Sequence, residues 1–283
     1  MERGEIPKKE RKKLKKRFNG FYAKESYALF LYRSIESLKE GGKLVFIIPD
    51  TYLNLNRHKE IRKFILTKTK INEIALFPSS YFPGINFGYA NLSIIALEKC
   101  SNKTKCSKNS FKLIKGYKSV EELGKENIQH LTKLNIKQSS ILNNEGFVFL
   151  TNSNTLITDC IKKSQVKIGD ICDCATGFYS LIENRLFDQS IVGIFPKDIK
   201  LLDYLLAFFN SPTCNKLIRT INPSTNNSSN YIKKIPFLRP TPGDIKTITE
   251  NSKQIVQQVK SSMTYDLHLE EENNQLINDL YGF

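Results

Sequence analysis

Two short stretches of the sequence combine side chains that can recognise a nucleic acid. The stretch STNNSSNYIKK at residues 224–234 carries amides, hydroxyls and lysines, at Asn226, Asn227, Ser228, Ser229, Asn230, Lys233 and Lys234. Amides and hydroxyls suit base edges, an asparagine amide can pair bidentately with adenine, and lysines suit phosphates. The stretch is therefore a candidate DNA-contacting loop, although Asn- and Ser-rich segments also form ordinary polar loops.

The second stretch, CATGFYS at residues 174–180, places a glycine among polar and aromatic side chains. Gly177 suits a tight turn, and Thr176 and Tyr179 beside it can meet bases or phosphates. Cys174 belongs to a set of six cysteines with neither paired CxxC spacing nor the density of a disulfide scaffold. We therefore expect reduced thiols in a cytoplasmic protein and no metal site.

The overall charge favours a polyanionic partner. The chain carries 43 Lys and Arg against 28 Asp and Glu, a formal net charge of +15, which makes nucleic acid the first candidate. A general over-use of Lys, Asn and Ile would also raise the charge. Residues 1–17 form a basic run without apolar periodicity, either a phosphate-contacting arm or a solvated tail. No apolar run approaches the ~18 residues that span a bilayer, so we expect no membrane partner.

These candidate residues must be positioned by a fold, and the first hundred residues predict an α/β arrangement. Helical spacing over residues 24–38 ends at Gly41-Gly42, and residues 57–67 repeat a helical pattern. KLVFIIP at 43–49 is continuously apolar, which predicts a strand buried on both faces of a parallel sheet. Further strands are predicted at 71–77 and 91–99. This order is typical of the C-terminal half of a doubly wound sheet.

The rest of the chain is more irregular. Residues 100–111 are polar and basic, and predict a surface loop or linker. GFVFL at 146–150, residues 167–180 and residues 190–197 predict short strands and turns, and residues 198–221 predict a helix broken at Asn210-Ser211-Pro212. Residues 243–280 predict one or two terminal helices. The expected divisions are a basic tail at 1–20, a partial catalytic domain at 21–111, a recognition domain at 112–240 and a helical segment at 241–283.

Several stretches together resemble one enzyme family. ESYALFLYRSIESLKEGGKLVFIIPDTYLNLNRHKEIRKFIL, then LLDYLLAFFNSP followed by NYIKKIPFLRP, and finally INDLYGF, are similar to segments of the N6-adenine DNA methyltransferases of restriction-modification systems. The resemblance covers nearly the whole chain after residue 20. It implies the C-terminal half of a Rossmann-like methyltransferase sheet, followed by an α+β target-recognition domain and a C-terminal helix. It also implies double-stranded DNA as partner and S-adenosylmethionine as methyl donor.

The resemblance assigns one wall of a base pocket to the loop PSSYFPGINFGYA at residues 78–90. Enzymes that modify a base hold it, flipped out of the stack, between aromatic or apolar faces. Phe82 stands where the family places such an aromatic, and Tyr81 and Phe87 are neighbours that could take the role. The resemblance also places Glu25 and Tyr27 on the helix that faces the pocket. The alternatives are a hydrophobic loop packed on the sheet and an exposed glutamate at a helix start.

Two motifs of the family are missing from these 283 residues. S-adenosylmethionine needs a glycine-rich turn after a strand, and the adenine amino group needs an Asn/Asp-Pro-Pro-Tyr/Phe motif. We therefore expect the chain to be inactive alone, with no cofactor site of its own, and to dock onto a separately encoded N-terminal methyltransferase half. The alternatives are a non-catalytic DNA-binding specificity subunit and the remnant of a disrupted gene.

Overall fold

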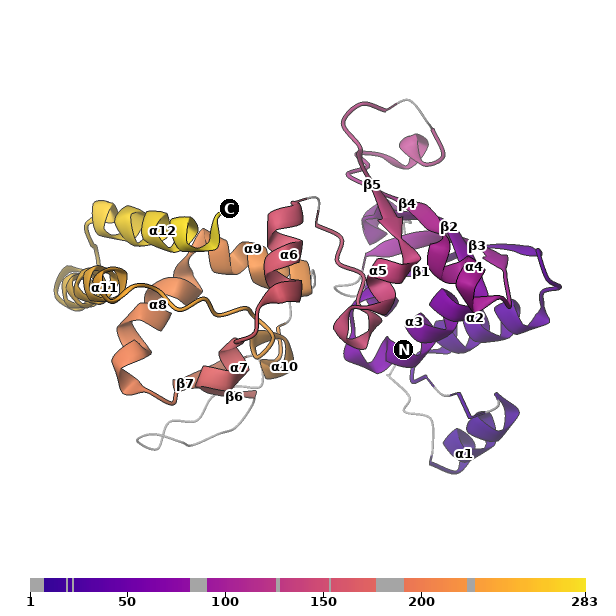
Figure 1. The fold of residues 1–283 in the computed structure, drawn as a ribbon, viewed down its shortest axis with the longest axis horizontal. Coiled ribbons are helices and arrows are strands. Elements are labelled where there is room, and N and C mark those ends of the chain that lie inside the picture. The colour runs from indigo at the N-terminus through magenta and orange to yellow at the C-terminus, as the bar shows by residue number, and fades with distance from the viewer. Residues whose placement is uncertain are drawn as a thin grey trace. The chain divides into compact units, whose positions relative to one another are not determined.

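The computed structural model describes residues 8–18, 20–21, 23–81, 91–125, 128–152, 154–176, 191–222 and 227–283 (Figure 1). The chain divides into two compact units, Met1–Ser153 and Asn154–Phe283. The first unit extends beyond residue 111, where a domain boundary was expected, because two further strands join its sheet. Among the described residues, no helix is long and apolar enough to cross a membrane.

The first unit is built on a mixed five-stranded sheet. Its strands are β1 (Lys43–Pro49), β2 (Thr69–Phe77), β3 (Leu92–Lys99), β4 (Ser110–Lys115) and β5 (Thr132–Lys137). The spatial order is β1-β3-β2-β4-β5. Among the described strands, β2 and β4 pair in parallel, whereas β3 pairs antiparallel with both β1 and β2, and β4 with β5. The predicted α/β class and three of these strands are confirmed, whereas β4 and β5 were not predicted.

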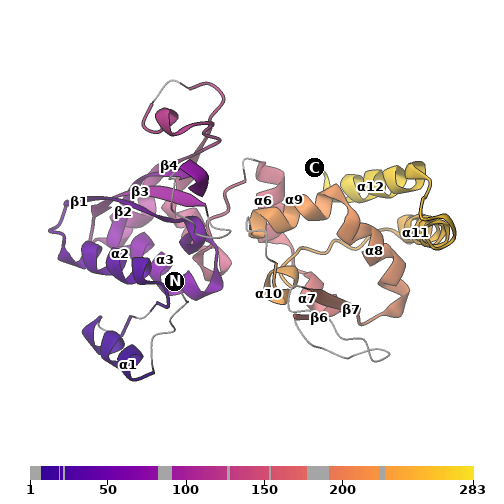
Figure 2. The same cartoon turned by 180° about the vertical axis from the view of Figure 1, so that it is seen from behind.

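One face of this sheet is covered by helices α2 (Ser26–Ser37), α3 (Lys59–Lys68) and α5 (Gln138–Leu142). Figure 2 shows α2 and α3 on the same side of the strands. Their buried side chains pack on alternate residues of every strand; they include Leu31, Ile35, Ile61, Ile65 and Ile141 against Ile48, Ile74, Ile95, Leu97, Phe111 and Leu113. Gly41 adopts a positive φ of 77° in the turn after α2, so the two-glycine signal marks a real turn.

The other face is open at β1. Side chains of a strand alternate between faces, and Val45 and Ile47 are 65% and 52% exposed. The expectation that residues 43–49 are buried on both faces of a parallel sheet is therefore wrong for this chain: β1 has one covered face and an antiparallel neighbour. Toward β2 and β4 the same face is covered by a small cluster that includes Ala75, Ile114 and Tyr117.

Two predictions from local sequence fail in this unit, the linker at residues 100–111 and the strand at residues 146–150. The basic run contains helix α1 (Lys8–Arg17), and the expected linker contains α4 (Lys103–Lys108). The Asn102 side chain caps α4 by accepting from the Lys105 amide at 3.0 Å, and Cys106 is buried. Residues 146–150 form no strand; Phe149 is buried in the core instead. The described part of the first unit also contains 3-10 turns at Asp50–Leu53, Asn56–His58, Ser79–Tyr81, Val120–Glu122 and Glu145–Phe147, and the second unit contains one at Ile199–Leu201.

The second unit is mainly helical. Its elements are α6 (Thr155–Lys163), α7 (Ile168–Ile171), β6 (Cys172–Thr176), β7 (Val192–Pro196), α8 (Leu202–Asn210), α9 (Pro212–Ile221), α10 (Ser229–Ile232), α11 (Pro242–Ser262) and α12 (Leu267–Tyr281). Its core includes rings of Phe208 and Tyr281, which stack at 5.6 Å. The predicted break at Asn210-Ser211-Pro212 is confirmed, because Ser211 caps α9 and Pro212 starts it. The prediction of one or two terminal helices is confirmed, and the structure has two, α11 and α12.

Candidate nucleic-acid interface

A polar cluster lies in the first unit, where β1 ends. The Tyr27 hydroxyl on α2 lies 2.8 Å from Thr51 Oγ1 and 2.9 Å from His58 Nε2. Glu25 Oε1 pairs with Arg57 Nε at 2.6 Å. The cluster therefore joins the start of α2 to the segment that follows β1. Ligands of open α/β sheets bind outside the carboxyl ends of strands, which is where this cluster sits.

A buried arginine holds the segment that follows β1. Arg62 on α3 is fully buried and donates to the carbonyl oxygens of Tyr52, Leu55 and Gly146 at 2.8, 2.8 and 2.9 Å. Three backbone carbonyls are thereby satisfied by one charged group, which fixes the two 3-10 turns that carry Thr51 and His58. This role of Arg62 could not be read from the helical pattern, which predicts only an amphipathic helix.

Burial sets the protonation of this cluster. Burial, with the positive charges of Arg57 and Arg62, lowers the pKa of His58 to about 3, so its imidazole is neutral at pH 7. Its Nδ1 atom is buried and lacks a hydrogen-bond partner among the described atoms. Burial raises the pKa of the Tyr27 phenol, which therefore stays protonated. Burial also raises the pKa of Asp50 to about 6, although hydrogen bonds with Asn91 oppose the shift.

The aromatic loop begins and ends at this edge of the sheet. It leaves β2 after Phe77 and returns at Asn91, whose carbonyl oxygen accepts from the Asp50 amide at 3.0 Å. Phe82 and Phe87 lie outside the described residues, so the predicted role of Phe82 stays a prediction. Tyr81 donates its hydroxyl to the Tyr117 carbonyl at 2.7 Å and stacks on Phe77. Tyr81 is therefore engaged in packing.

The two polar stretches of the second unit meet in space. Thr176 Oγ1, at the end of β6, accepts from the Ser229 amide at the start of α10 at 2.8 Å. The Ser228 carbonyl oxygen accepts from the Tyr231 amide at 2.9 Å and so helps to begin α10. Asn230 is exposed on this short helix. Gly177, Tyr179 and Asn226 lie outside the described residues, and their predicted contacts stay predictions.

The two predicted lysines follow α10 closely. Lys233 is exposed and Lys234 half-buried. The backbone at Lys233 is fixed, because its carbonyl oxygen accepts from the Gly169 amide at 3.0 Å. A Cβ atom on Gly169 would come within 2.9 Å of the Lys233 Cβ. The absence of a side chain at position 169 therefore allows α7 and the Lys233 backbone to approach this closely.

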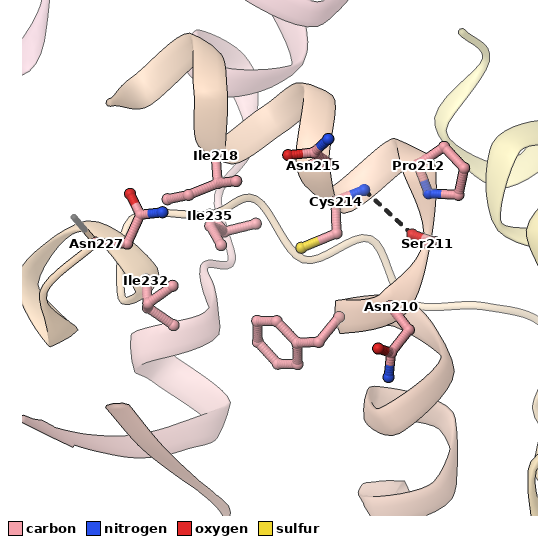
Figure 3. A pocket seen from close by; sticks show the side chains of 10 residues that line it. Asn210, Ser211, Pro212, Cys214, Asn215, Ile218, Asn227, Ile232 and Ile235 are labelled. Atoms are coloured by element: carbon pink, nitrogen blue, oxygen red, sulfur yellow. Dashed lines mark hydrogen bonds between the residues drawn. The ribbon is translucent and has the colours of Figure 1, made fainter. Parts of the chain in front are cut away.

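A cavity of about 490 Å³ adjoins this region of the second unit (Figure 3). The residues that line it are Phe209, Asn210, Ser211, Pro212, Cys214, Asn215, Ile218, Asn227, Ile232 and Ile235. Asn227 Oδ1 accepts from the Asn222 side chain at 2.8 Å, which orients the amide of Asn227. Burial raises the pKa of the Cys214 thiol to about 12. Cys214 is therefore an inert wall of the cavity rather than a nucleophile.

The cysteines give no sign of metal binding. Cys172 and Cys174 alternate with exposed Asp173 along β6, and both thiols are buried. Burial raises the pKa of Cys172 to about 11. Within the described ranges, no group of three or more His, Cys, Asp or Glu side chains is placed to hold a metal ion.

Comparison with known proteins finds similarity to methylases and methyltransferases of restriction-modification systems. Residues 1–82 match the family model described as Eco57I restriction-modification methylase. The Type II methyltransferase M.HindII of Haemophilus influenzae is 25% identical over 165 residues, which are 54% of this chain and 31% of that protein. The Type II methyltransferase M.HincII, also of Haemophilus influenzae, is 34% identical over 61 residues, which are 21% of this chain and 12% of that protein. Parts of the chain are therefore similar to restriction-modification methyltransferases.

The chain spans less than a third of the length of each of these two curated relatives. The solved structure of the type IIG restriction endonuclease BpuSI superposes with a TM-score of 0.40 at 13% identity, over 96% of this chain and 36% of that one. The family model covers β1, the Tyr27 and His58 cluster and the start of the aromatic loop. The polar edge of the first unit therefore lies in the part of the chain with the family likeness.

The sequence indicated some of these site residues and missed others. Glu25 and Tyr27 were indicated by the family resemblance, and the structure brings both to the edge where β1 ends. Asp50 and His58 were not proposed, because a carboxylate after a strand and a lone histidine carry no motif. The nearest signal is position: Asp50 directly follows the apolar run that forms β1.

Proposed function

We propose that this chain is part of a site-specific DNA adenine-N6 methyltransferase of a restriction-modification system. The first unit supplies one wall of the base pocket through Phe82, and the second unit supplies DNA contacts through Thr176, Asn227 and Lys233. The observation that carries the proposal is the meeting of the aromatic loop, at Asn91, with Asp50 after β1. That edge is where an open α/β sheet binds its ligands.

The proposal requires methyl-donor chemistry from another stretch of protein. When bound, S-adenosylmethionine supplies the methyl group. The 283 residues contain no glycine-rich turn that fits it and no Asn/Asp-Pro-Pro-Tyr/Phe motif. We propose that a partner stretch, on the same or a separate polypeptide, supplies both and packs on the exposed face of β1. Val45 and Ile47 support this, because an apolar strand with one exposed face is suited to a covering layer.

Reconstitution tests the proposal. The chain is mixed with a polypeptide that carries the glycine-rich turn and the Pro-Pro motif, and transfer of a labelled methyl group to DNA is measured. We expect transfer only from the mixture, and a severalfold or greater loss with Phe82→Ala, because the flipped base loses its stacking partner. Phe30→Ala is the matched control, since Phe30 is 65% exposed on α2. Full activity of the Phe82 variant contradicts its assignment to the base pocket.

A second candidate function is a DNA-binding specificity protein without catalysis of its own. The contact between Thr176 and Ser229 favours it, because it assembles the two polar stretches within the second unit. In that case the chain alone shifts duplex DNA with a sequence preference that survives moderate salt. Binding that disappears with salt equally for every sequence reduces the interaction to charge attraction.

A further inference from the structure

The positive charge of the chain is divided unequally between the two units. Residues 154–283 contain 14 Lys and Arg and 14 Asp and Glu, so the whole excess of 15 positive charges belongs to residues 1–153. Contacts between basic side chains and phosphates supply most of the non-specific affinity of a DNA-binding protein. The second unit, which carries the predicted base-contacting residues, therefore brings no net charge attraction of its own.

The first unit displays part of this excess on the outer face of β4 and β5. The two strands pair antiparallel, with Ser110 opposite Lys137, Lys112 opposite Asn135 and Ile114 opposite Lys133. Directly opposed residues share a face, so Lys112, Lys133 and Lys137 lie on one face; we call these three lysines the β4–β5 basic face. All three are exposed. The opposite face carries Phe111 and Leu113, which are buried under the helices.

This face is accessible at its three lysines, whereas Ile114, opposite Lys133, belongs to the small cluster that covers the same face toward β2 and β4. The strand β5 lies at the end of the strand order, and the helices of the core cluster cover the other side of the sheet. Lys133 and Lys137 are four residues apart on one strand, which corresponds to roughly 13 Å at ~3.3 Å per residue. That length matches about four base-pair steps of B-DNA at ~3.4 Å each. The acidic residue Glu73 on β2 lies beside Lys112.

We propose that the β4–β5 basic face binds the phosphate backbone of duplex DNA. This inference rests on the proposed function and divides it between the units: the first unit supplies sequence-independent affinity, and the second supplies base contacts. Three lysines on a strand pair can neutralise phosphates along one side of a duplex without reading its sequence. Lys233 and Lys234, the lysines singled out by sequence, then act locally beside the recognition stretch.

Salt dependence of DNA binding tests the assignment. The triple variant Lys112→Gln, Lys133→Gln, Lys137→Gln removes three charges from the face. The matched control Lys162→Gln, Lys163→Gln, Lys260→Gln removes three charges from exposed positions of the second unit. The dissociation constant of each full-length variant for duplexes of several sequences is measured from low to moderate salt, and circular dichroism verifies folding.

We expect the slope of log affinity against log salt to fall by about 2 to 3 in the face variant, because each phosphate contact contributes ~0.9. The ranking of DNA sequences should remain that of the unaltered chain, and the control should keep its slope. An unchanged slope in the face variant, or an equal loss in the control, overturns the assignment while DNA binding by the unaltered chain still supports the proposed function. Failure of the unaltered chain to bind any duplex overturns both.

Discussion

His58 is a buried histidine that the fold holds uncharged, and its surroundings explain how. Its side chain is 0% exposed, it lies 2.9 Å from the Tyr27 hydroxyl, and Arg57 and Arg62 oppose its protonation. The Oε2 atom of Glu25 lies 3.6 Å from the Nε2 atom of His58, and this carboxylate oxygen is buried. The histidine therefore acts as a neutral spacer that links α2 to the segment after β1.

The depressed pKa of His58 predicts a pH dependence of stability. The folded pKa is about 3, below the ~6.5 of an unfolded chain, so the unfolded state binds more protons between these values. The free energy of unfolding is therefore unaffected by protonation of His58 above pH ~6.5. Below that pH, protonation of the unfolded state lowers it by ~1.4 kcal/mol per pH unit. Urea unfolding from pH 7 to 4 should show a shallower loss in His58→Gln than in the unaltered chain.

The test of this prediction must allow for the titration of Asp50 and needs a control at a second histidine. Asp50 acts in the opposite direction, because its raised folded pKa of about 6 makes the folded state bind more protons between pH ~4 and 6. The informative quantity is therefore the difference between the two proteins at each pH. His130→Gln is the control, since that ring is 34% exposed beside Glu122. Parallel curves for His58→Gln and the unaltered chain contradict the neutral, buried state of His58.

A second residue-scale prediction concerns Gly169. Gly169→Ala places a Cβ atom within 2.9 Å of the Lys233 Cβ and 3.1 Å of its carbonyl oxygen. We expect a loss of ~1–3 kcal/mol in the free energy of unfolding, because rigid backbone must move. Gly243→Ala is the control: its nearest neighbour is Thr241 Oγ1 at 3.7 Å, and alanine stabilises a helix relative to glycine by ~0.5–1 kcal/mol. Equal stability of both variants contradicts the close approach.

At the scale of elements, variants on the two faces of β1 test separately whether this strand is needed for folding and for docking of the proposed partner. Val45→Lys with Ile47→Lys alters only the exposed face of β1, so the unfolding free energy should change by no more than ~0.5 kcal/mol per position. The proposed covering layer would then have to bury two charges, and reconstituted methyl transfer should fail. Leu44→Lys, on the covered face, should instead unfold the unit. Retained transfer in the double variant excludes this face as the docking surface.

The sequence predicts those elements whose signals are local. The break between α8 and α9 follows from a serine cap and a proline at the first helical position. Helix α4 was missed because its stability depends on Cys106 packing in the core and on Gln138, which binds Asn109 from 29 residues away. β5 was missed because its half-buried residues alternate with exposed Lys133, Asn135 and Lys137. Both elements are determined by partners that lie far along the chain.

At the scale of the whole molecule, sequence and structure indicate different parts of the candidate interface. Residue types alone indicated the recognition stretch, and the structure joins its two parts through Thr176 and Ser229. The distribution of charge is also present in the sequence. The β4–β5 basic face, however, depends on a strand register that no local pattern specifies. The predicted domain divisions remain a proposal about function, while the compact units divide after Ser153.

The open side of β1 also has a consequence for the abundance of the chain in a cell. A strand edge and an apolar face without a cover are a template for self-association, and two copies can present the same surface to each other. Self-association grows with concentration, whereas capture by a partner depends on the ratio of the two polypeptides. A cell that makes this chain in excess of its proposed partner should accumulate aggregates or degrade the surplus. Balanced synthesis would then be a condition for a working enzyme.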